Sequence, residues 1–545
     1  MPDVLLIQPP IQDFYITTKR TIPYGLTCIA ACLIAKGFSV EIFDALATNK
    51  SRVIDMPLEM AYLSEYYNES DISPFALFHY YKHFGYSFEY IAHVARESSA
   101  FLIGISSLFT AYSDIALKTA EIIKDTYPRA KIVLGGHHPT HFPEHVMESK
   151  AIDFVLRGEG EVSMPLLASR LKGKKDISDV PGIVYRQPNG KLIINEPAYI
   201  ENLDDMPLPA FHLINHSYYQ RNHRNSAVVV ASRGCPLSCS YCAMGSQTNP
   251  FRKKSISYII REIHQYIHEQ NVRFIDFEDE NLTIDRKWFQ TLMCSLRDHF
   301  SGINVEYRAM NGLFLPSLED DMIIQMKLLG FQSFNISLCS TSIEQLHRFQ
   351  RQNVTEYFNH IMEKFKEYGL DAVAYIIVGG PYQKAEESIQ DLMFLAKHRV
   401  LAGVSVYYPA PGSKDFEMLT TMGLLPKYFS LMRSTALPIS HITTQKQSIT
   451  LLRLSRIVNF IKQLIDRGIP LTCSEPLLNT SQMEINKYSK EALGLMLAKP
   501  FFNDGIIRGI RDDGYIYQHT IDHQLTKKFI NEFHYSYIKG VKSTI

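Results

Sequence analysis

The residues of this 545-residue chain best suited to chemistry are three closely spaced cysteines, Cys235, Cys239 and Cys242. They directly follow the apolar, β-branched run 227–230, which predicts a buried strand that a Gly and a Pro then end. Soft thiolate ligands at this spacing suit an iron–sulfur cluster or a zinc ion. A structural zinc site takes four protein ligands, and no fourth Cys or His lies nearby in sequence. Three thiolates on a four-iron cluster leave one iron open to a small molecule.

The spacing Cys-x3-Cys-x2-Cys, with Tyr241 before the last cysteine, resembles the signature of the radical S-adenosylmethionine (SAM) superfamily. This resemblance implies that the three cysteines hold a 4Fe–4S cluster and that SAM binds the open iron. In that family one electron from the cluster cleaves SAM to a 5′-deoxyadenosyl radical. The alternative is a zinc-binding or simply buried cysteine cluster.

The composition sets the class of protein. Apolar residues make up 46% and charged residues 21%, which is typical of a soluble globular protein. A formal net charge of zero gives no general attraction for nucleic acid. The remaining cysteines are scattered, which argues against a disulfide framework and favours a reducing, cytoplasmic setting. The N-terminus lacks a signal-peptide pattern, and no apolar run is long enough for an integral membrane segment.

Strands and helices alternate over residues 1–170, apart from an insertion at 49–99. This pattern predicts an α/β, Rossmann-like domain with a parallel sheet. Such sheets bind ligands at the carboxyl ends of their strands. The polar and Gly-rich turns expected at that edge contain Gln8, Pro9, Ser106, Ser107, Gly135, Gly136, His137, Gly158, Glu159 and Gly160.

Placed ahead of a radical SAM core, this domain resembles the cobalamin-binding domain of cobalamin-dependent radical SAM enzymes. The resemblance implies that the turn residues named above bind cobalamin. The D-x-H-x-x-G motif of other cobalamin proteins is absent, so the lower axial ligand of cobalt stays open. His137 and His138 are interpreted as turn residues that touch the corrin or its tail. A vestigial domain that binds nothing is the alternative.

Residues 171–220 predict a hairpin and linker, and six strands alternating with helices over 221–424 predict a partial (β/α)6 barrel. Barrel chemistry lies at the carboxyl ends of the strands. The family resemblance implies SAM contacts from Tyr241, Asp279, Glu280, Arg308, Ser340, Gly379 and Gly380. Whether Asp279 or Glu280 binds the SAM amino group stays open, and no catalytic residue is predicted. Cys339 stands where this class often has a Glu before the Ser.

Residues 425–545 match no motif and predict a mainly helical domain, which in this class helps to shape the substrate pocket. The resemblance implies a methyltransferase that uses methylcobalamin and a 5′-deoxyadenosyl radical to methylate an unactivated carbon of a small-molecule or natural-product substrate. It also implies a reductant such as flavodoxin or ferredoxin as partner, and no nucleic acid. One alternative is radical cyclisation, oxidation or rearrangement without methyl transfer. Another is a non-catalytic iron–sulfur electron-transfer or sensor protein.

Overall fold

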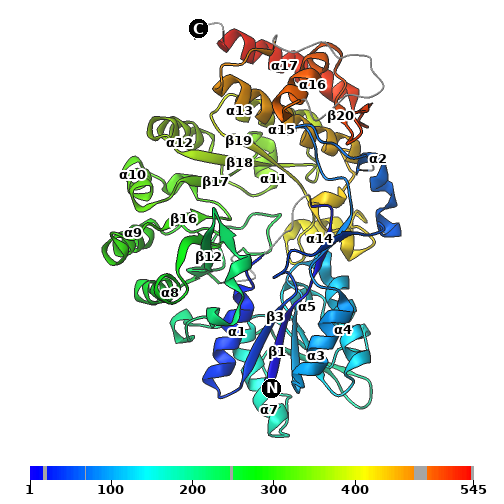
Figure 1. Ribbon diagram of the computed structural model, residues 1–545, viewed down its shortest axis with the longest axis vertical. Helices are drawn as coiled ribbons and strands as arrows, with labels where there is room; N and C mark the ends of the chain where they lie inside the picture. Colours follow the sequence, from blue (N-terminus) through cyan, green and yellow to red (C-terminus); the bar gives the residue numbers. More distant parts are fainter. Residues whose placement is uncertain (16–20, 68, 246–249, 472–487, 542–545) are drawn as a thin grey trace.

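The computed structural model describes residues 1–15, 21–67, 69–245, 250–471 and 488–541. In Figure 1 the N-terminal domain lies at the bottom, the barrel in the middle and the C-terminal helices at the top. The α/β N-terminal domain, the α/β barrel and the helical C-terminal region agree with the fold class predicted from the sequence. No helix in these ranges is long and apolar enough to cross a membrane.

The N-terminal domain is built on a seven-stranded sheet in the order β10-β9-β8-β7-β6-β1-β3. Its strands are β1 (Val4–Gln8), β3 (Val40–Asp44), β6 (Leu102–Ser106), β7 (Lys131–Gly135), β8 (Phe154–Leu156), β9 (Ile183–Arg186) and β10 (Leu192–Ile194). The five strands from β3 to β8 run parallel, so their carboxyl ends share one edge. The predicted hairpin, β9–β10, extends this sheet antiparallel to β8.

Helices cover both faces of this sheet. They are α1 (Tyr24–Ala35), α3 (Phe88–Ser98), α4 (Ser113–Thr126), α5 (His137–His141), α6 (Pro143–Glu148) and α7 (Gly160–Lys172). Because side chains alternate along a strand, Leu6 packs into the core that contains α1 and α7, whereas Leu5 packs into the core that contains α3 and α4. The helix predicted over Phe88–Ser98 is confirmed as α3.

The helix predicted over 74–84 is wrong. Its last residues form β5 (Lys82–Phe84), which pairs with β2 (Ile11–Asp13) and β4 (Ser51–Val53) in a small sheet. The backbone of this segment finds partners on two strands, and that tertiary pairing overrides local helical spacing. Upstream, Phe75 packs edge-on against Phe460 at 5.4 Å between ring centroids, so this region contacts the C-terminal domain.

The barrel has six parallel strands, as predicted. They are β12 (Arg224–Val229), β15 (Val272–Phe277), β16 (Glu306–Ala309), β17 (Ser333–Cys339), β18 (Asp371–Val378) and β19 (Leu401–Val406). Continuous pairing stops between β16 and β17, where isolated bridges such as Leu313–Ile336 connect the two parts. The surrounding helices are α8 (Ile256–Glu269), α9 (Arg286–Phe300), α10 (Asp320–Leu329), α11 (Ile343–Arg348), α12 (Thr355–Tyr368), α13 (Ala385–Ala396) and α14 (Lys414–Thr421).

The C-terminal region is mainly helical, as predicted. It contains α15 (Gln445–Asp466), α16 (Lys490–Asp504), the hairpin β20 (Arg508–Ile510) and β21 (Ile516–Gln518), and α17 (His523–Val541). Helix α15 lies along the last barrel strand, where Asn459 bonds both main-chain groups of Ala402 at 2.8 and 3.0 Å. This region is therefore fixed to the barrel.

Candidate functional site

The three cysteines lie on the loop after β12 and line a cavity of about 190 Å³. Gly234, at a φ of 77°, turns the chain out of the strand, and two main-chain bonds shape the loop: Cys235 N to Met244 O and Cys242 N to Cys239 O, both at 3.1 Å. The other lining residues come from the ends of neighbouring strands and from one loop; they are Leu237, Tyr241, Gly245, Glu280, Asn281, Asn311, Gly312, Leu313, Ser337 and Arg351.

The arrangement of the cysteines fits a cluster better than a single ion. Among the residues that the structure describes, no three His, Cys, Asp or Glu side chains converge to hold one metal ion. The thiolates on a four-iron cluster each bind a different iron, so they stand further apart than the ligands of one zinc. Burial raises the pKa values of the Cys235 and Cys242 thiols, so these thiols need a bound cation to ionise at neutral pH.

Three polar atoms on residues of this cavity are buried without a hydrogen-bond partner in the described chain: Glu280 Oε2, Asn281 Oδ1 and Arg351 Nε. Buried polar atoms are normally paired, so an unpaired set marks a place for a ligand. Two acceptors and one donor match the ammonium and carboxylate groups of an amino acid, which SAM carries at one end. Burial raises the pKa of Glu280 to about 7, as expected for a carboxyl group that awaits a cationic partner.

The adjacent carboxyl groups of Asp279 and Glu280 have different surroundings. Asp279 accepts hydrogen bonds from Ala231 N at 3.1 Å and from Ser232 Oγ at 2.5 Å, which fixes the chain just before the cysteine loop. Glu280 has the unpaired oxygen in the cavity. Of the two candidates for the SAM amino group, this geometry favours Glu280.

The remaining residues predicted to bind SAM lie outside the cavity lining. Arg308 pairs with Asp276 on the neighbouring strand, with Nε donating to Oδ1 at 3.2 Å. Ser340 donates to Asp391 at 2.8 Å. Gly379 and Gly380 pack closely against neighbouring side chains. A Cβ at Gly380 would lie 2.7 Å from Phe349, and one at Gly379 would lie 2.8 Å from Ser448.

Sequence reasoning missed Arg351. Its Nη1 donates to Cys239 Sγ at 3.7 Å and to Tyr241 Oη at 3.1 Å, while Nη2 donates to Ser337 O at 2.9 Å. Arg351 lies more than a hundred residues after the cysteines, in a loop without a motif. Asn281 was not predicted either, but it directly follows Glu280 in the acidic turn, so its position in the sequence could have identified it.

The predicted cobalamin residues at the ends of β6 and β7 form an open polar edge. Ser107 Oγ is buried and has no partner in the described residues, and Gly136 has a φ of 122°. Next to them Leu108 and Phe109 are 43% and 52% exposed, which leaves an apolar surface for a large flat ligand such as a corrin. His137 is exposed, and desolvation by the surrounding protein lowers the pKa of its imidazole. Gln8 donates to Thr21 O at 2.9 Å beside Pro9.

We expect Gly136→Ala to reduce cobalamin retention by at least about tenfold. The new Cβ would lie 2.6 Å from Ser107 O, in a backbone conformation that alanine rarely adopts, so the loops after β6 and β7 must separate. Absorbance after desalting measures the retained cobalamin. Gly190→Ala is the control, because Gly190 also has a positive φ but faces open space. Equal retention by both variants would contradict the prediction.

The turn at Gly158, Glu159 and Gly160 faces the barrel domain. Both carboxylate oxygens of Glu159 accept hydrogen bonds, from Arg233 at 2.9 Å and from Arg252 at 2.9 and 3.0 Å. Arg233 also donates to Glu161 at 2.5 Å. Because Arg233 stands two residues before Cys235, this arginine–glutamate cluster fixes the cysteine loop against the N-terminal domain. Gly158 and Gly160 pack on other parts of the chain, since a Cβ at Gly158 would meet Ala198 and one at Gly160 would meet Ile29 of α1.

Replacing Arg233 by methionine should lower the free energy of unfolding by about 3–5 kcal/mol, because it leaves Glu159 and Glu161 as buried carboxylates short of a partner. The matched control is Arg170→Met, which removes a much more exposed ion pair with Asp179 and should cost less than about 1 kcal/mol. Urea-induced unfolding, followed by circular dichroism, compares the two. Similar losses in both variants would show that the arginine–glutamate cluster contributes no more than a surface pair.

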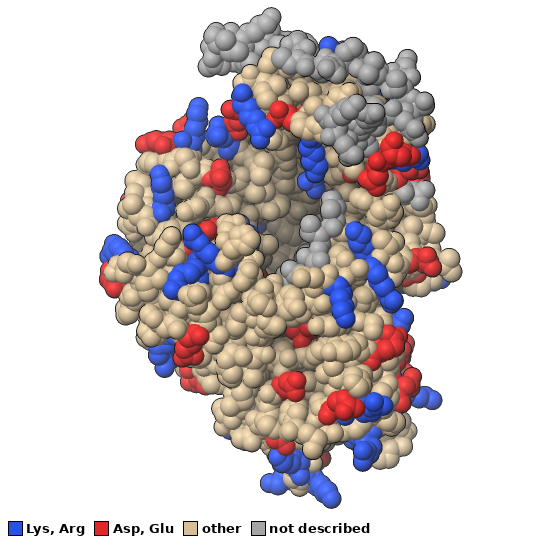
Figure 2. Space-filling view, viewed as in Figure 1, with Lys and Arg blue, Asp and Glu red and all other residues tan. Residues whose placement is uncertain are grey.

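The segment after β19 contacts both candidate sites. Asp415 N, at the start of α14, donates to Ser240 O in the cysteine loop at 2.9 Å. Just before α14, Gly412 lies against His141 of α5, where a Cβ would come within 2.3 Å of the ring. The carboxyl ends of the barrel strands therefore meet the carboxyl edge of the N-terminal sheet, and Figure 2 shows a hollow near the centre of the molecule.

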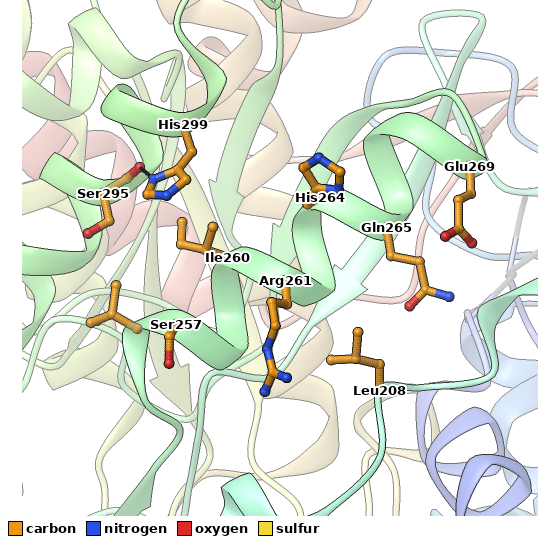
Figure 3. A pocket seen from close by; sticks show the side chains of 10 residues that line it. Leu208, Ser257, Ile260, Arg261, His264, Gln265, Glu269, Ser295 and His299 are labelled. Carbon is orange, nitrogen blue, oxygen red and sulfur yellow. Dashed lines mark hydrogen bonds between the residues drawn. The ribbon is translucent and has the colours of Figure 1, made fainter.

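A larger cavity of about 910 Å³ lies elsewhere, between α8 and α9 (Figure 3). Its polar side chains include Arg261, His264 and His299, and the ring of His299 is held by Ser295 O at 2.8 Å. None of the residues predicted to bind a cofactor lines it. It lies on the outer side of the barrel helices, so the cysteine cavity remains the candidate for chemistry.

Comparison with known proteins finds two matching families along the chain. Residues 57–168 match the family described as the B12 binding domain, and residues 229–395 match the radical SAM superfamily. An uncharacterized methyltransferase of Pyrococcus horikoshii is 27% identical over 460 residues, which cover 82% of this chain and 90% of the relative. An anaerobic magnesium-protoporphyrin IX monomethyl ester cyclase of Rubrivivax gelatinosus is 26% identical over 315 residues, 56% of each chain.

Among solved structures, the radical SAM methyltransferase TsrM from Kitasatospora setae, with cobalamin and a 4Fe–4S cluster bound, has a TM-score of 0.58. It is 14% identical, and the match covers 77% of this chain and 74% of that one, which shows a shared fold. The cofactors of the present chain are a 4Fe–4S cluster, SAM and cobalamin. A match to the B12 binding domain followed by a match to the radical SAM superfamily is the arrangement that the resemblance to cobalamin-dependent, methyltransferase-like radical SAM enzymes predicts.

Proposed function

We propose that this radical SAM enzyme transfers a methyl group to an unactivated carbon of a small-molecule or natural-product substrate. The observation that carries the proposal is that one segment, after β19, contacts both sites: Asp415 N donates to Ser240 O of the cysteine loop at 2.9 Å, and Gly412 lies against His141 next to the cobalamin edge. A substrate held between them would reach both cofactors. When bound, SAM at the cluster supplies a radical that removes hydrogen, and cobalamin supplies the methyl group.

In this proposal the protein binds and orients the cofactors and the substrate, and it excludes water from them. Cys235, Cys239 and Cys242 hold the cluster, and Glu280 with Asn281 accepts hydrogen bonds from the SAM ammonium group. Ser107 and Gly136 let the edge of the N-terminal sheet approach the corrin closely. A low-potential reductant and a cytoplasmic setting, both expected from the sequence, remain parts of the proposal.

One observation favours a second candidate. A relative is named as a magnesium-protoporphyrin IX monomethyl ester cyclase, so ring formation without methyl transfer is the alternative function. A purely electron-transferring protein is disfavoured, because it has no use for unpaired polar atoms around the cysteines.

Anaerobic reconstitution with iron, sulfide and cobalamin, followed by SAM, a reductant and candidate substrates, tests the proposal by mass spectrometry. Methyl transfer would yield S-adenosylhomocysteine together with 5′-deoxyadenosine and a product heavier by one methyl group. Deoxyadenosine without S-adenosylhomocysteine would favour the cyclase-like alternative. A fully loaded protein that forms neither product with any substrate would contradict both.

A further inference from the structure

Arg351 brings a positive charge to the cysteine cavity without a carboxylate to balance it. Within the described chain, its hydrogen-bond partners are a thiol sulfur, a phenol oxygen and a main-chain carbonyl, on Cys239, Tyr241 and Ser337. Its Nε is fully buried and has no partner there. Buried cations in proteins are normally paired with an anion, so a countercharge is expected in the cavity itself.

Two other arginines with largely buried side chains, Arg233 and Arg433, show what Arg351 lacks. Arg233 pairs with Glu159 and Glu161, and Arg433 pairs with Asp13 at 3.0 Å. At Arg351 the atom in the corresponding place is the sulfur of Cys239. Once Cys239 is a cluster ligand, its thiolate gives Nη1 of this guanidinium a negatively charged partner, and the unpaired Nε stays available to the SAM carboxylate.

The position of the guanidinium is fixed by the fold. The loop 349–351 after α11 is tied to the cysteine loop, because Ser240 N donates to Phe349 O at 2.9 Å and Ser240 Oγ donates to Arg348 O at 3.1 Å. Tyr241 packs edge-on against Phe349 at 5.0 Å and offers its hydroxyl to Arg351. The guanidinium therefore cannot move away without breaking contacts on several sides.

We propose that Arg351 is a positioning residue that sets the reduction potential of the cluster through Cys239. The inference rests on the proposed role of Cys239 as a ligand. In reduction, one electron enters the cluster from a low-potential one-electron donor, no bond forms or breaks, and no proton is taken up. The cluster and its thiolates gain one negative charge, and a fixed cation hydrogen-bonded to a ligand sulfur stabilises the reduced form more than the oxidised form.

The test compares full-length wild type with Arg351→Gln, Arg351→Lys and the control Arg348→Gln, each reconstituted anaerobically with cobalamin bound. Arg348 lies three residues away and pairs with Glu344 and Gln345, so its side chain contacts none of the cysteines among its described partners. Titration with dithionite or titanium(III) citrate, followed by electron paramagnetic resonance of the reduced cluster, gives the midpoint potential. We expect a more negative midpoint for Arg351→Gln, a smaller shift for Arg351→Lys and none for Arg348→Gln.

An unchanged midpoint in Arg351→Gln with a full iron content would overturn the proposal, even if the variant were less stable. If that variant fails to load iron, Arg351→Lys decides, because lysine keeps the charge and cannot reproduce the two-pronged contact with Cys239 Sγ and Ser337 O. A negative shift there supports the proposal, and no shift overturns it. If the reconstituted wild type gave no reduced-cluster signal, the assignment of the cysteines as ligands would be wrong. This outcome distinguishes a failure of the proposed function from a failure of the role proposed for Arg351.

Discussion

Cys239→Ala is expected to abolish both the iron–sulfur absorbance and the formation of 5′-deoxyadenosine, which should fall to the background level. The three cysteines on the loop after β12 line one cavity, and removal of one leaves a cluster iron without its protein ligand. The described lining of the cavity offers no fourth thiol to take its place. Iron analysis and mass spectrometry of the reaction mixture measure the two losses.

Cys294→Ala is the matched control for this prediction. Cys294 is an exposed free cysteine on α9, outside the cavity, so its removal should change neither cluster content nor deoxyadenosine formation. If Cys239→Ala kept a complete cluster and normal SAM cleavage, the ligand assignment would have to be abandoned.

The second large effect is expected at Glu280. Glu280→Gln should weaken SAM binding by about ten- to a hundredfold while the cluster remains, since a hydrogen bond to a charged group contributes about 1.5–3 kcal/mol. The side chain keeps its shape and loses only the charge that would face the ammonium group. Equilibrium dialysis of labelled SAM against cluster-loaded protein measures the change in dissociation constant.

Asp279→Asn supplies the contrast, because the two neighbouring carboxyl groups have different partners. Asp279 accepts from Ala231 N and Ser232 Oγ, so an amide in its place should lower the thermal midpoint by several degrees. Glu280→Gln should leave that midpoint unchanged or higher, because it removes a buried carboxyl group with an unpaired oxygen. Equal SAM affinity in wild type and Glu280→Gln would exclude Glu280 from the SAM site.

Local sequence patterns predicted most of the fold. Most of the barrel strands and of the parallel N-terminal strands are apolar runs followed by Gly, Pro or polar residues, and these signals need no tertiary information. The helix prediction over 74–84 failed because the end of this segment pairs with β2 and β4, which lie far away in sequence. The hairpin β9–β10 was recognised, but its attachment to the edge of the N-terminal sheet depends on pairing with β8.

The residues of the candidate site also fall into two groups, those that local sequence predicts and those that it does not. The cysteines and the acidic turn are contiguous motifs, so residue type and spacing were enough to find them. The choice between Asp279 and Glu280 required hydrogen-bond partners, which only the structure provides. Arg351 reaches Cys239 from 112 residues away, and a lone arginine in a loop gives no sequence signal.

The contacts between the segment after α2 (Ser64–Tyr67) and the C-terminal hairpin have a consequence for synthesis on the ribosome. Asp71 accepts from Ile510 N across 439 residues of chain and also pairs with His519 at 3.1 Å. At about 5–20 residues per second, the early segment must wait roughly 20–90 s for these partners to be translated. Its apolar side chains, including Phe75, are exposed for that time, so chaperone binding during translation is expected to concentrate there.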